Sequence, residues 1–184
     1  MQFGSKKSNR GYTLIEVLVI VVVVAVISAI AAPSWLGFLT RQRLNAAQAE
    51  ALAVMRAAQI NAKREKRVWE ACFWQNSTEK KVQWSAHPAP STNSQFCTNA
   101  RWQNLIGADN AQVVIDTTSS SKSTLIDRNN IYRVQFNDKG RVHGQLGKIT
   151  FTVPNQNNGL KRCVYVSTLL GAMRTDSDRG CRGD

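Results

Sequence analysis

The hydrophobic positions of this chain gather in one long run near its amino terminus. Between residues 12 and 39 only Glu16 is charged, and the stretch from Val17 to Ala32 holds nothing but Val, Leu, Ile and Ala apart from Ser28. A helix rises about 1.5 Å per residue and the apolar core of a bilayer is about 30 Å thick, so a run of this length can cross a membrane. The pattern therefore predicts a transmembrane helix over residues 12–39.

Small and apolar residues then return with the period of a helix, over residues 40–67. They are Leu44, Ala47, Ala51, Met55, Ala58 and Ala62. Positions three or four apart share one face of a helix, so this segment is expected to continue the first helix in amphipathic form. A kink is expected at Pro33, because proline cannot donate a backbone hydrogen bond inside a helix.

The pattern changes to short alternating stretches in residues 68–184. Strands are expected at 81–85, 111–116, 131–136, 148–153 and 162–167, the last of them before a tail rich in Gly, Arg and Asp. The polar turn Asn137–Gly140 predicts a hairpin whose second strand begins near Arg141. A long helix followed by an antiparallel meander is an α+β fold, with residues 68–184 as its β-rich globular domain.

A cleaved secretory signal peptide is the simplest alternative reading of the amino terminus. Its cleavage site would follow the apolar run, at small residues such as Ala31-Ala32. The run is long for a signal core, however, and it carries the carboxylate of Glu16 near its start. An unpaired charge inside a membrane costs about 3 kcal/mol or more, so such a residue is usually functional.

The stretch Gly11-Tyr12-Thr13-Leu14-Ile15-Glu16 in front of this run resembles the type IV pilin and pseudopilin superfamily. The resemblance implies that Met1–Gly11 is a leader, cut after Gly11 by a prepilin peptidase on the cytoplasmic side. Tyr12, in place of the usual Phe, would become the N-methylated first residue. Pro33 stands where the family has its helix-kinking proline.

The resemblance also implies a role in assembly for Glu16, the fifth residue of the mature chain. In the family, this carboxylate pairs with the amino terminus of a neighbouring subunit, an attraction that is large in a low dielectric. A pair within one chain is the alternative, since positions four apart share a helix face. Both pairs can form in succession, the first in the membrane and the second in the filament.

Residues 136–174 resemble one pilin subfamily, the H-type pseudopilins of type II secretion and the T-type fimbrial minor pilins. The matching segments are Phe136, Asp138-Lys139-Gly140, Ile149–Phe151, Asn158-Gly159, Arg162–Ser167 and Gly171–Arg174. In fimbrial members a closing Gly-Arg-x-Arg motif is implicated in DNA binding during natural transformation. Here Gly171 and Arg174 carry over, but Ala172 replaces the first arginine; Arg179 and Arg182 follow closely and can supply the lost charge to a phosphate.

The charge of the chain adds to this picture. The formal net charge of +12 falls to +9 once Lys6, Lys7 and Arg10 of the leader are removed. Cations before an apolar span place the amino terminus in the cytoplasm, so the remainder is exported. A basic exported domain attracts polyanions, although the charge can equally serve solubility alone.

Four cysteines are present, at positions 72, 97, 163 and 181. An even number in an exported domain predicts two disulfides; proximity in sequence favours Cys72–Cys97 and Cys163–Cys181 among the three possible pairings. A zinc site is disfavoured, because there is no Cys-x-x-Cys and His87 and His143 are not spaced as ligands.

No sequence motif for catalysis or for nucleotide phosphates is found, so the chain is predicted not to be an enzyme and to need no metal or cofactor. The predicted function is that of a minor pilin or pseudopilin, a structural or initiating subunit of a type IV pilus or of a type II secretion pseudopilus. The alternative is a DNA-binding minor pilin displayed on the filament. The expected partners are the prepilin peptidase, other subunits, the bacterial inner membrane crossed once before assembly, and DNA in the alternative.

Overall fold

The computed structural model describes residues 11–79, 81–90, 96–98, 100–106, 112–117, 122–154 and 159–182, without the side chains of residues 30–34. It divides into two compact units, Met1–Leu39 and Thr40–Asp184. The leader cations Lys6, Lys7 and Arg10 lie outside the described residues. So does the side chain of Pro33, and the kink expected there stays a prediction.

A single helix, α1 (Leu14–Glu65), forms most of the amino-terminal third of the chain. It lies inside the range 12–67 that the apolar run and its continuation predict. Among the residues whose side chains are described, no helix is both long and apolar enough to cross a bilayer. The membrane span over residues 12–39 is therefore not confirmed and stays a prediction.

The stripe predicted on the second half of α1 is the helix face of the protein core. All six of its residues are fully buried: Leu44, Ala47, Ala51, Met55, Ala58 and Ala62. Because four of these are alanines, the helix can approach the strands closely, and large apolar side chains from the strands fill the space between them. Residues from Thr40 onward therefore belong to the same compact unit as the strands.

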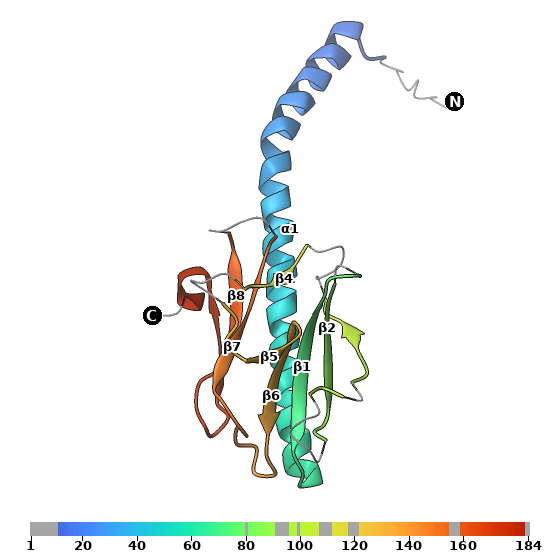
Figure 1. The fold of residues 1–184 in the computed structure, drawn as a ribbon. Helices are drawn as coiled ribbons and strands as arrows, with labels where there is room; N and C mark the ends of the chain where they lie inside the picture. Colours follow the sequence, from blue (N-terminus) through green and yellow to red (C-terminus); the bar gives the residue numbers. More distant parts are fainter. Residues whose placement is uncertain are drawn as a thin grey trace, which may run out of the picture. The chain divides into compact units, whose positions relative to one another are not determined.

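Two antiparallel sheets make up the rest of that unit, and the part of α1 from Thr40 onward lies behind them in Figure 1. The first has the order β3-β2-β1-β6-β5, with β1 (Trp69–Asn76), β2 (Lys81–Pro88), β3 (Gln103–Asn104), β5 (Ile126–Arg128) and β6 (Ile131–Phe136). The second has the order β4-β7-β8-β9, with β4 (Val114–Ile115), β7 (Gly147–Thr152), β8 (Lys161–Val166) and β9 (Met173–Ser177), which a short 3-10 helix, η2 (Asp178–Cys181), follows. The α+β fold is confirmed.

The core lies between α1 and the inner faces of the sheets. Its largest fully buried side chains include Phe73 of β1, Phe136 of β6 and Phe151 of β7. Each comes from a different strand, so the core joins both sheets to the helix. Burying a side chain of this size stabilises the fold by about 2–3 kcal/mol.

The turn expected at Asn137–Gly140 forms, but the second strand expected after it does not. The N–H of Asn137 donates to the carbonyl of Arg141 and the N–H of His143 to the carbonyl of Gln135 (both 2.9 Å), on either side of an isolated bridge between Phe136 and Val142. The next strand is β7, which belongs to the other sheet. The N–H of Val142 points away from β6 and donates to the carbonyl of Leu169, in the turn between β8 and β9 (2.9 Å).

Candidate functional site

The start of α1 has the geometry of a helix cap. Thr13 precedes the first helical residue, and its hydroxyl accepts a hydrogen bond from the backbone N–H of Glu16 (3.3 Å). A Thr at the cap and a Glu three residues later are the two ends of a capping box. The carboxylate of Glu16 also lies in the first turn, where a negative charge suits the helix dipole. Thr13 and Glu16 therefore stabilise the start of α1.

The junction between Gly11 and Tyr12 is open. A side-chain carbon built on Gly11 would meet no atom within 4 Å, and 77 % of Tyr12 is exposed. The described part of the chain therefore gives no packing reason for a glycine at position 11. Residues 1–10 on its other side lie outside the described residues.

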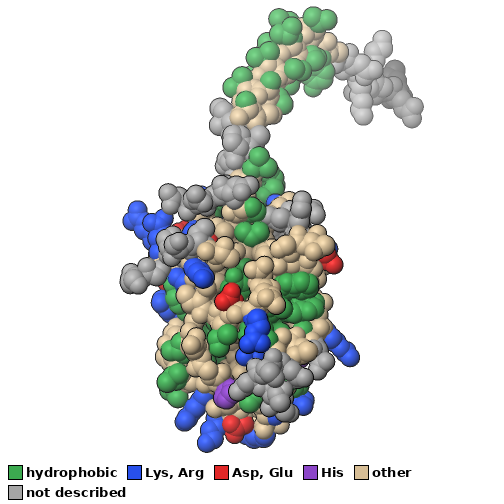
Figure 2. All heavy atoms as spheres, in the orientation of Figure 1, with side chains coloured by type: hydrophobic (Ala, Val, Ile, Leu, Met, Phe, Trp, Pro, Cys, Tyr) green, Lys and Arg blue, Asp and Glu red, His purple; other side chains and the backbone are tan. Residues whose placement is uncertain are grey.

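The helix beyond this junction exposes a continuous apolar surface. From Leu14 to Ile27 every large apolar side chain is about half exposed or more, with values between 49 % and 85 %. In Figure 2 the coloured side chains along this segment are green, whereas blue Lys and Arg side chains are scattered over the unit that contains the sheets. Soluble monomers rarely expose an apolar patch of this extent, so the segment requires an apolar partner.

Both disulfides join the cysteines that sequence proximity favours. Cys72 of β1 is bonded to Cys97, and Cys163 of β8 is bonded to Cys181 at the end of η2. The first fixes the segment after β2 to the face of the sheet turned away from α1. The second holds the basic tail against β8.

The four residues of the proposed DNA-binding tail do not form one group. Gly171 is buried, with a φ of +84°, and a side-chain carbon there would lie 2.5 Å from the carbonyl oxygen of Gly140. The guanidinium of Arg174 lies 4.3 Å above the ring of Tyr165 and pairs with Asp176 (3.2 Å). Both residues therefore have structural roles within the fold.

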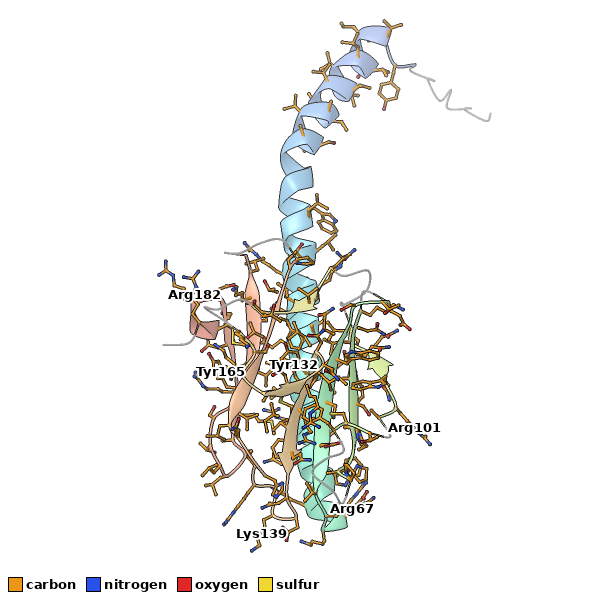
Figure 3. The ribbon with its side chains drawn as sticks, viewed as in Figure 1. Arg67, Arg101, Tyr132, Lys139, Tyr165 and Arg182 are labelled. Atoms are coloured by element: carbon orange, nitrogen blue, oxygen red, sulfur yellow. A yellow bond between two sulfur atoms is a disulfide. The ribbon has the colours of Figure 1, made fainter. Side chains whose placement is uncertain are left out.

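Arg179 and Arg182 are placed differently. Both are exposed, and both border a pocket of about 230 Å³ beside Lys161 and Asp178. Figure 3 shows Arg182 pointing outward from η2, while Tyr165 lies on the neighbouring strand. Of the tail cations, these two border one pocket and form no ion pair with a described residue, whereas the exposed Arg174 is paired with Asp176.

A buried polar cluster on the first sheet was not expected from the sequence. The carboxylate of Glu70, fully buried on β1, lies 2.9 Å from His87 Nε2, 3.5 Å from the guanidinium of Arg133 and 3.0 Å from the side-chain amide of Gln135. Burial lowers the pKa of Arg133, and the charge of Glu70 opposes that shift. Strand register alone brings these residues together, since Glu70 is paired with His87 on one side and with Gln135 on the other.

A second buried cluster lies on the other sheet. Lys161 pairs with Asp116 (2.8 Å), and both side chains are almost fully buried. Lys148 Nζ donates to the backbone carbonyl of Cys181 (2.6 Å). Burial lowers the pKa of Lys148; Asp116 opposes this shift and Lys161 adds to it.

Within the described residues, one group of possible metal ligands lies close together, formed by Glu70, Cys72 and Cys97. Both sulfur atoms are already joined in a disulfide, so they cannot bind a metal ion as thiolates. The buried clusters therefore serve the fold, and the candidates for function are the amino-terminal segment and the exposed pair of tail arginines.

A family profile described as the prokaryotic N-terminal methylation motif matches residues 6–32. No curated protein sequence matches the chain.

Two crystal structures of the type IV minor pilin FimU of Pseudomonas aeruginosa are similar in fold. The crystal form in space group P21 gives a TM-score of 0.52 at 15 % identity, over 76 % of this chain and 92 % of that chain. The form in space group P65 gives 0.49 at 13 % identity, over 72 % and 92 %. The chain thus carries a prokaryotic N-terminal methylation motif at the start of α1 and shares the fold of a type IV minor pilin.

Proposed function

We propose that the chain is a minor subunit of a type IV pilus, made as a precursor, anchored in the inner membrane and then assembled through its amino-terminal helix. The observation that carries this proposal is the methylation motif at residues 6–32, followed directly by the apolar half of α1. The similarity to FimU, itself a minor pilin of a type IV pilus, favours the pilus over a secretion pseudopilus.

Processing between Gly11 and Tyr12 is the first step of this function. The exposed junction supports it, because a peptidase must reach both sides of the bond that it cuts. The open space around Gly11 supports it further: the described fold does not require this glycine, so recognition by the peptidase is the better reason for it. Methylation would then modify the amine of Tyr12.

Anchoring and assembly use the same apolar surface in succession. Lipid would cover residues 12–39 before assembly, and the helices of neighbouring subunits would cover them afterwards. Glu16 then lies in the first turn of a helix in an apolar environment, where an unpaired carboxylate is costly. The amine of Tyr12 on a neighbouring subunit is the cation that would neutralise it.

Mass spectrometry of the protein purified from membranes tests this function. The expected mature chain begins at Tyr12 and carries one additional methyl group on its amine. A chain that begins near Ala32 would identify a secretory signal peptide instead. A chain that keeps Met1 in cells with an active prepilin peptidase would also contradict the proposal.

DNA binding is a second candidate function, favoured by the placement of Arg179 and Arg182. Within the described residues neither side chain has an ion-pair partner, and the two border one pocket. Exposed cations can bind the phosphates of DNA. The resulting affinity for DNA depends little on base sequence and falls steeply as the salt concentration rises.

A titration of the full chain in detergent with duplex DNA tests this candidate. The double variant Arg179→Ala/Arg182→Ala should bind more weakly and flatten the salt dependence by about two units, one for each lost phosphate contact. The matched control is Arg56→Ala/Lys139→Ala, which removes two exposed cations elsewhere. Equal losses in both double variants would show a general effect of charge and would reject a site at the tail.

A further inference from the structure

Among the described residues, a strand partner covers the outer edge of β2 along only half of its length. Gln103 and Asn104 of β3 pair with Trp84 and Gln83, and the N–H of Leu105 donates to the carbonyl of Val82 (2.9 Å). The pairing stops at Trp84, although β2 continues to Pro88. The last four residues of β2, Ser85–Pro88, therefore form an open strand edge.

The pairing register of β2 shows which of its backbone N–H and C=O groups point outward at this edge. Alternate residues of an antiparallel strand direct their N–H and C=O groups to opposite neighbours. The bond from the N–H of Ala89 to the carbonyl of Val68 means that Ser85 and His87 point toward β1. The N–H and C=O of Ala86 and the C=O of Pro88 thus point outward, and no ladder partner for them lies among the described residues.

The segment before β3 is held away from this edge. Continued pairing would bring Arg101 opposite Ala86, but the ring of Trp102 packs on Trp74 of β1 (5.4 Å between centroids). Trp74 and Cys72 share the face of the sheet that is turned away from α1, and Cys72 is bonded to Cys97. These two contacts hold the described part of the segment over the outer face and away from the edge of β2.

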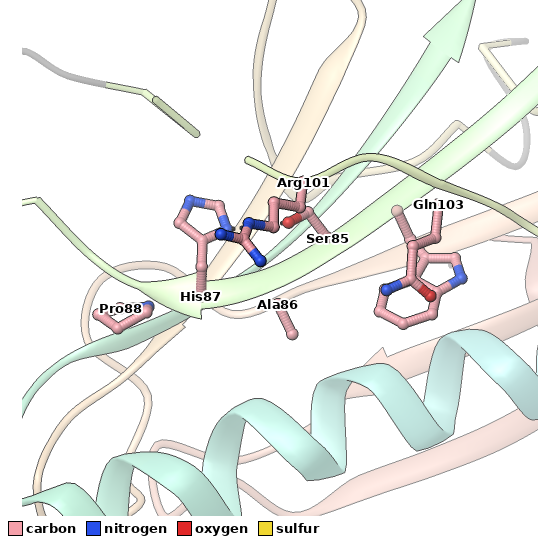
Figure 4. A pocket seen from close by; sticks show the side chains of 7 residues that line it. Ser85, Ala86, His87, Pro88, Arg101 and Gln103 are labelled. Carbon is pink, nitrogen blue, oxygen red and sulfur yellow. Dashed lines mark hydrogen bonds between the residues drawn. The ribbon is translucent and has the colours of Figure 1, made fainter. Parts of the chain in front are cut away.

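A groove of about 430 Å³ lies between the open edge and this segment. One side is formed by Ser85–Pro88, and Arg101 and Gln103 form part of the other, as Figure 4 shows. Arg101 is exposed and has no ion-pair partner in the part of the chain that the structure describes. No carboxylate is among the described residues that line the groove, and Arg101 is the cation among them.

We propose that this groove binds an extended peptide segment of another protein, which adds to β2 as a strand and places a carboxylate side chain on Arg101. An open edge supplies affinity through main-chain hydrogen bonds, and a nearby side chain supplies selectivity. A guanidinium selects a carboxylate through charge-assisted hydrogen bonds. The groove is preformed, which lowers the entropy cost of binding.

This inference rests on the proposed function, because a filament subunit needs lateral contacts. The peptide that binds is then an extended segment of the neighbouring subunit. Its test does not involve filaments or processing. The failure of one proposal would therefore leave the other untouched.

The probe is the synthetic peptide acetyl-Thr-Val-Glu-Val-Thr-amide, added to the full chain in detergent and followed by NMR. The expected result is slower hydrogen exchange at the backbone amide of Ala86. The variant Arg101→Glu should weaken binding about tenfold, the loss expected for one charge-assisted hydrogen bond. Lys139→Glu, the same charge change at another exposed site, should leave binding unchanged.

Two further peptides decide between strand addition and simple anion binding. Replacing Glu by Gln should weaken binding about as much as Arg101→Glu does, and methylating alternate backbone nitrogens should abolish it. Equal binding of the N-methylated peptide would show that the groove holds only a carboxylate and would overturn strand addition. An Ala86 amide that stays unprotected at about 1 mM peptide, the weak end of specific binding, would overturn the proposal as a whole.

Discussion

Gly171 occupies a position where a side chain has neither the backbone conformation nor the space that it needs. Its φ is +84°, and a side-chain carbon would meet the carbonyl oxygen of Gly140 and the amide of Gln59. That amide donates to the carbonyls of both glycines (2.8 and 3.0 Å), so Gln59 joins two turns to α1. The glycine that opens the tail motif is therefore explained by packing.

Replacing this glycine should destabilise the protein. We expect Gly171→Ala to lower the free energy of unfolding by about 2–4 kcal/mol, from a strained φ and a close backbone contact. Urea unfolding of the full chain in detergent measures the loss. Gly37→Ala is the control, because that position is helical and its side chain would meet no atom within 4 Å. A Gly171→Ala variant as stable as the control would contradict this account.

Lys148 predicts a dependence of stability on pH. Burial lowers its pKa below the usual 10.5, so the folded state releases this proton at a lower pH than the unfolded state does. The unfolded state then binds more protons, and stability rises with pH up to about 10.5. The free energy of unfolding of the wild type relative to Lys148→Met should therefore increase as the pH is raised toward 10.5.

Urea titrations of both proteins at several pH values above 7 measure that difference. Comparing the two proteins removes the contribution of Tyr132, whose pKa is raised by burial and by nearby aspartates in both. Lys139→Met, at an exposed position, serves as the control. Its free energy of unfolding relative to the wild type should not change with pH. If the free energy of unfolding of the wild type relative to Lys148→Met fell as the pH rises, the lowered pKa of Lys148 would be refuted.

At the scale of elements, the strands that could be predicted are those with one apolar and one polar face. β6 lies at residues 131–136 as its alternation predicts, and β7 and β8 are each within one residue of expectation. β1 does not alternate in this way, because its outer face carries Cys72 and Trp74, which the segment after β2 covers. Apart from Met173, β9 is polar, and it pairs only with β8 at the sheet edge, so its sequence carries little strand signal.

The features of the candidate site also divide into those that a local sequence pattern predicts and those that depend on the pairing of distant strands. The cap at Thr13 and Glu16 and both disulfides depend on residues close in sequence, and the sequence predicts the motif and the pairing. The cluster around Glu70 depends on the register of three strands, one of which the pattern did not predict. The groove beside β2 depends on where β3 stops pairing, which Trp102 and Cys97 determine together.

The two disulfides allow a prediction about elements. Their partners are 25 and 18 residues apart, so removing either bond should lower the free energy of unfolding by about 3 kcal/mol. The variants are Cys72→Ala/Cys97→Ala and Cys163→Ala/Cys181→Ala. Only the second should release the tail, and limited trypsin digestion should then cut first at Arg179 and Arg182. Equal protection of the tail in both variants would show that the bond to β8 does not hold it.

At the scale of the whole molecule, the two compact units differ in what stabilises them. The unit from Thr40 onward has a core shared by α1 and two sheets. In the first unit, none of the residues whose burial is described is buried. Under the proposed function, lipid and then other subunits cover this apolar helix, so Glu16 within it is the point at which assembly can be tested.

The most direct test of the filament role is the incorporation of Glu16 variants into pili. Glu16→Leu removes the carboxylate together with the cost of burying it, so the variant should accumulate in the membrane at the level of the wild type. Without the pair to a neighbouring Tyr12 amine, it should be absent from pili sheared from the cells. Glu16→Asp keeps the charge and should restore part of the incorporation. Immunoblots of the sheared and membrane fractions give the result: we predict wild type in both fractions and Glu16→Leu in the membrane alone, and a Leu variant present in sheared pili at the wild-type level would contradict the account.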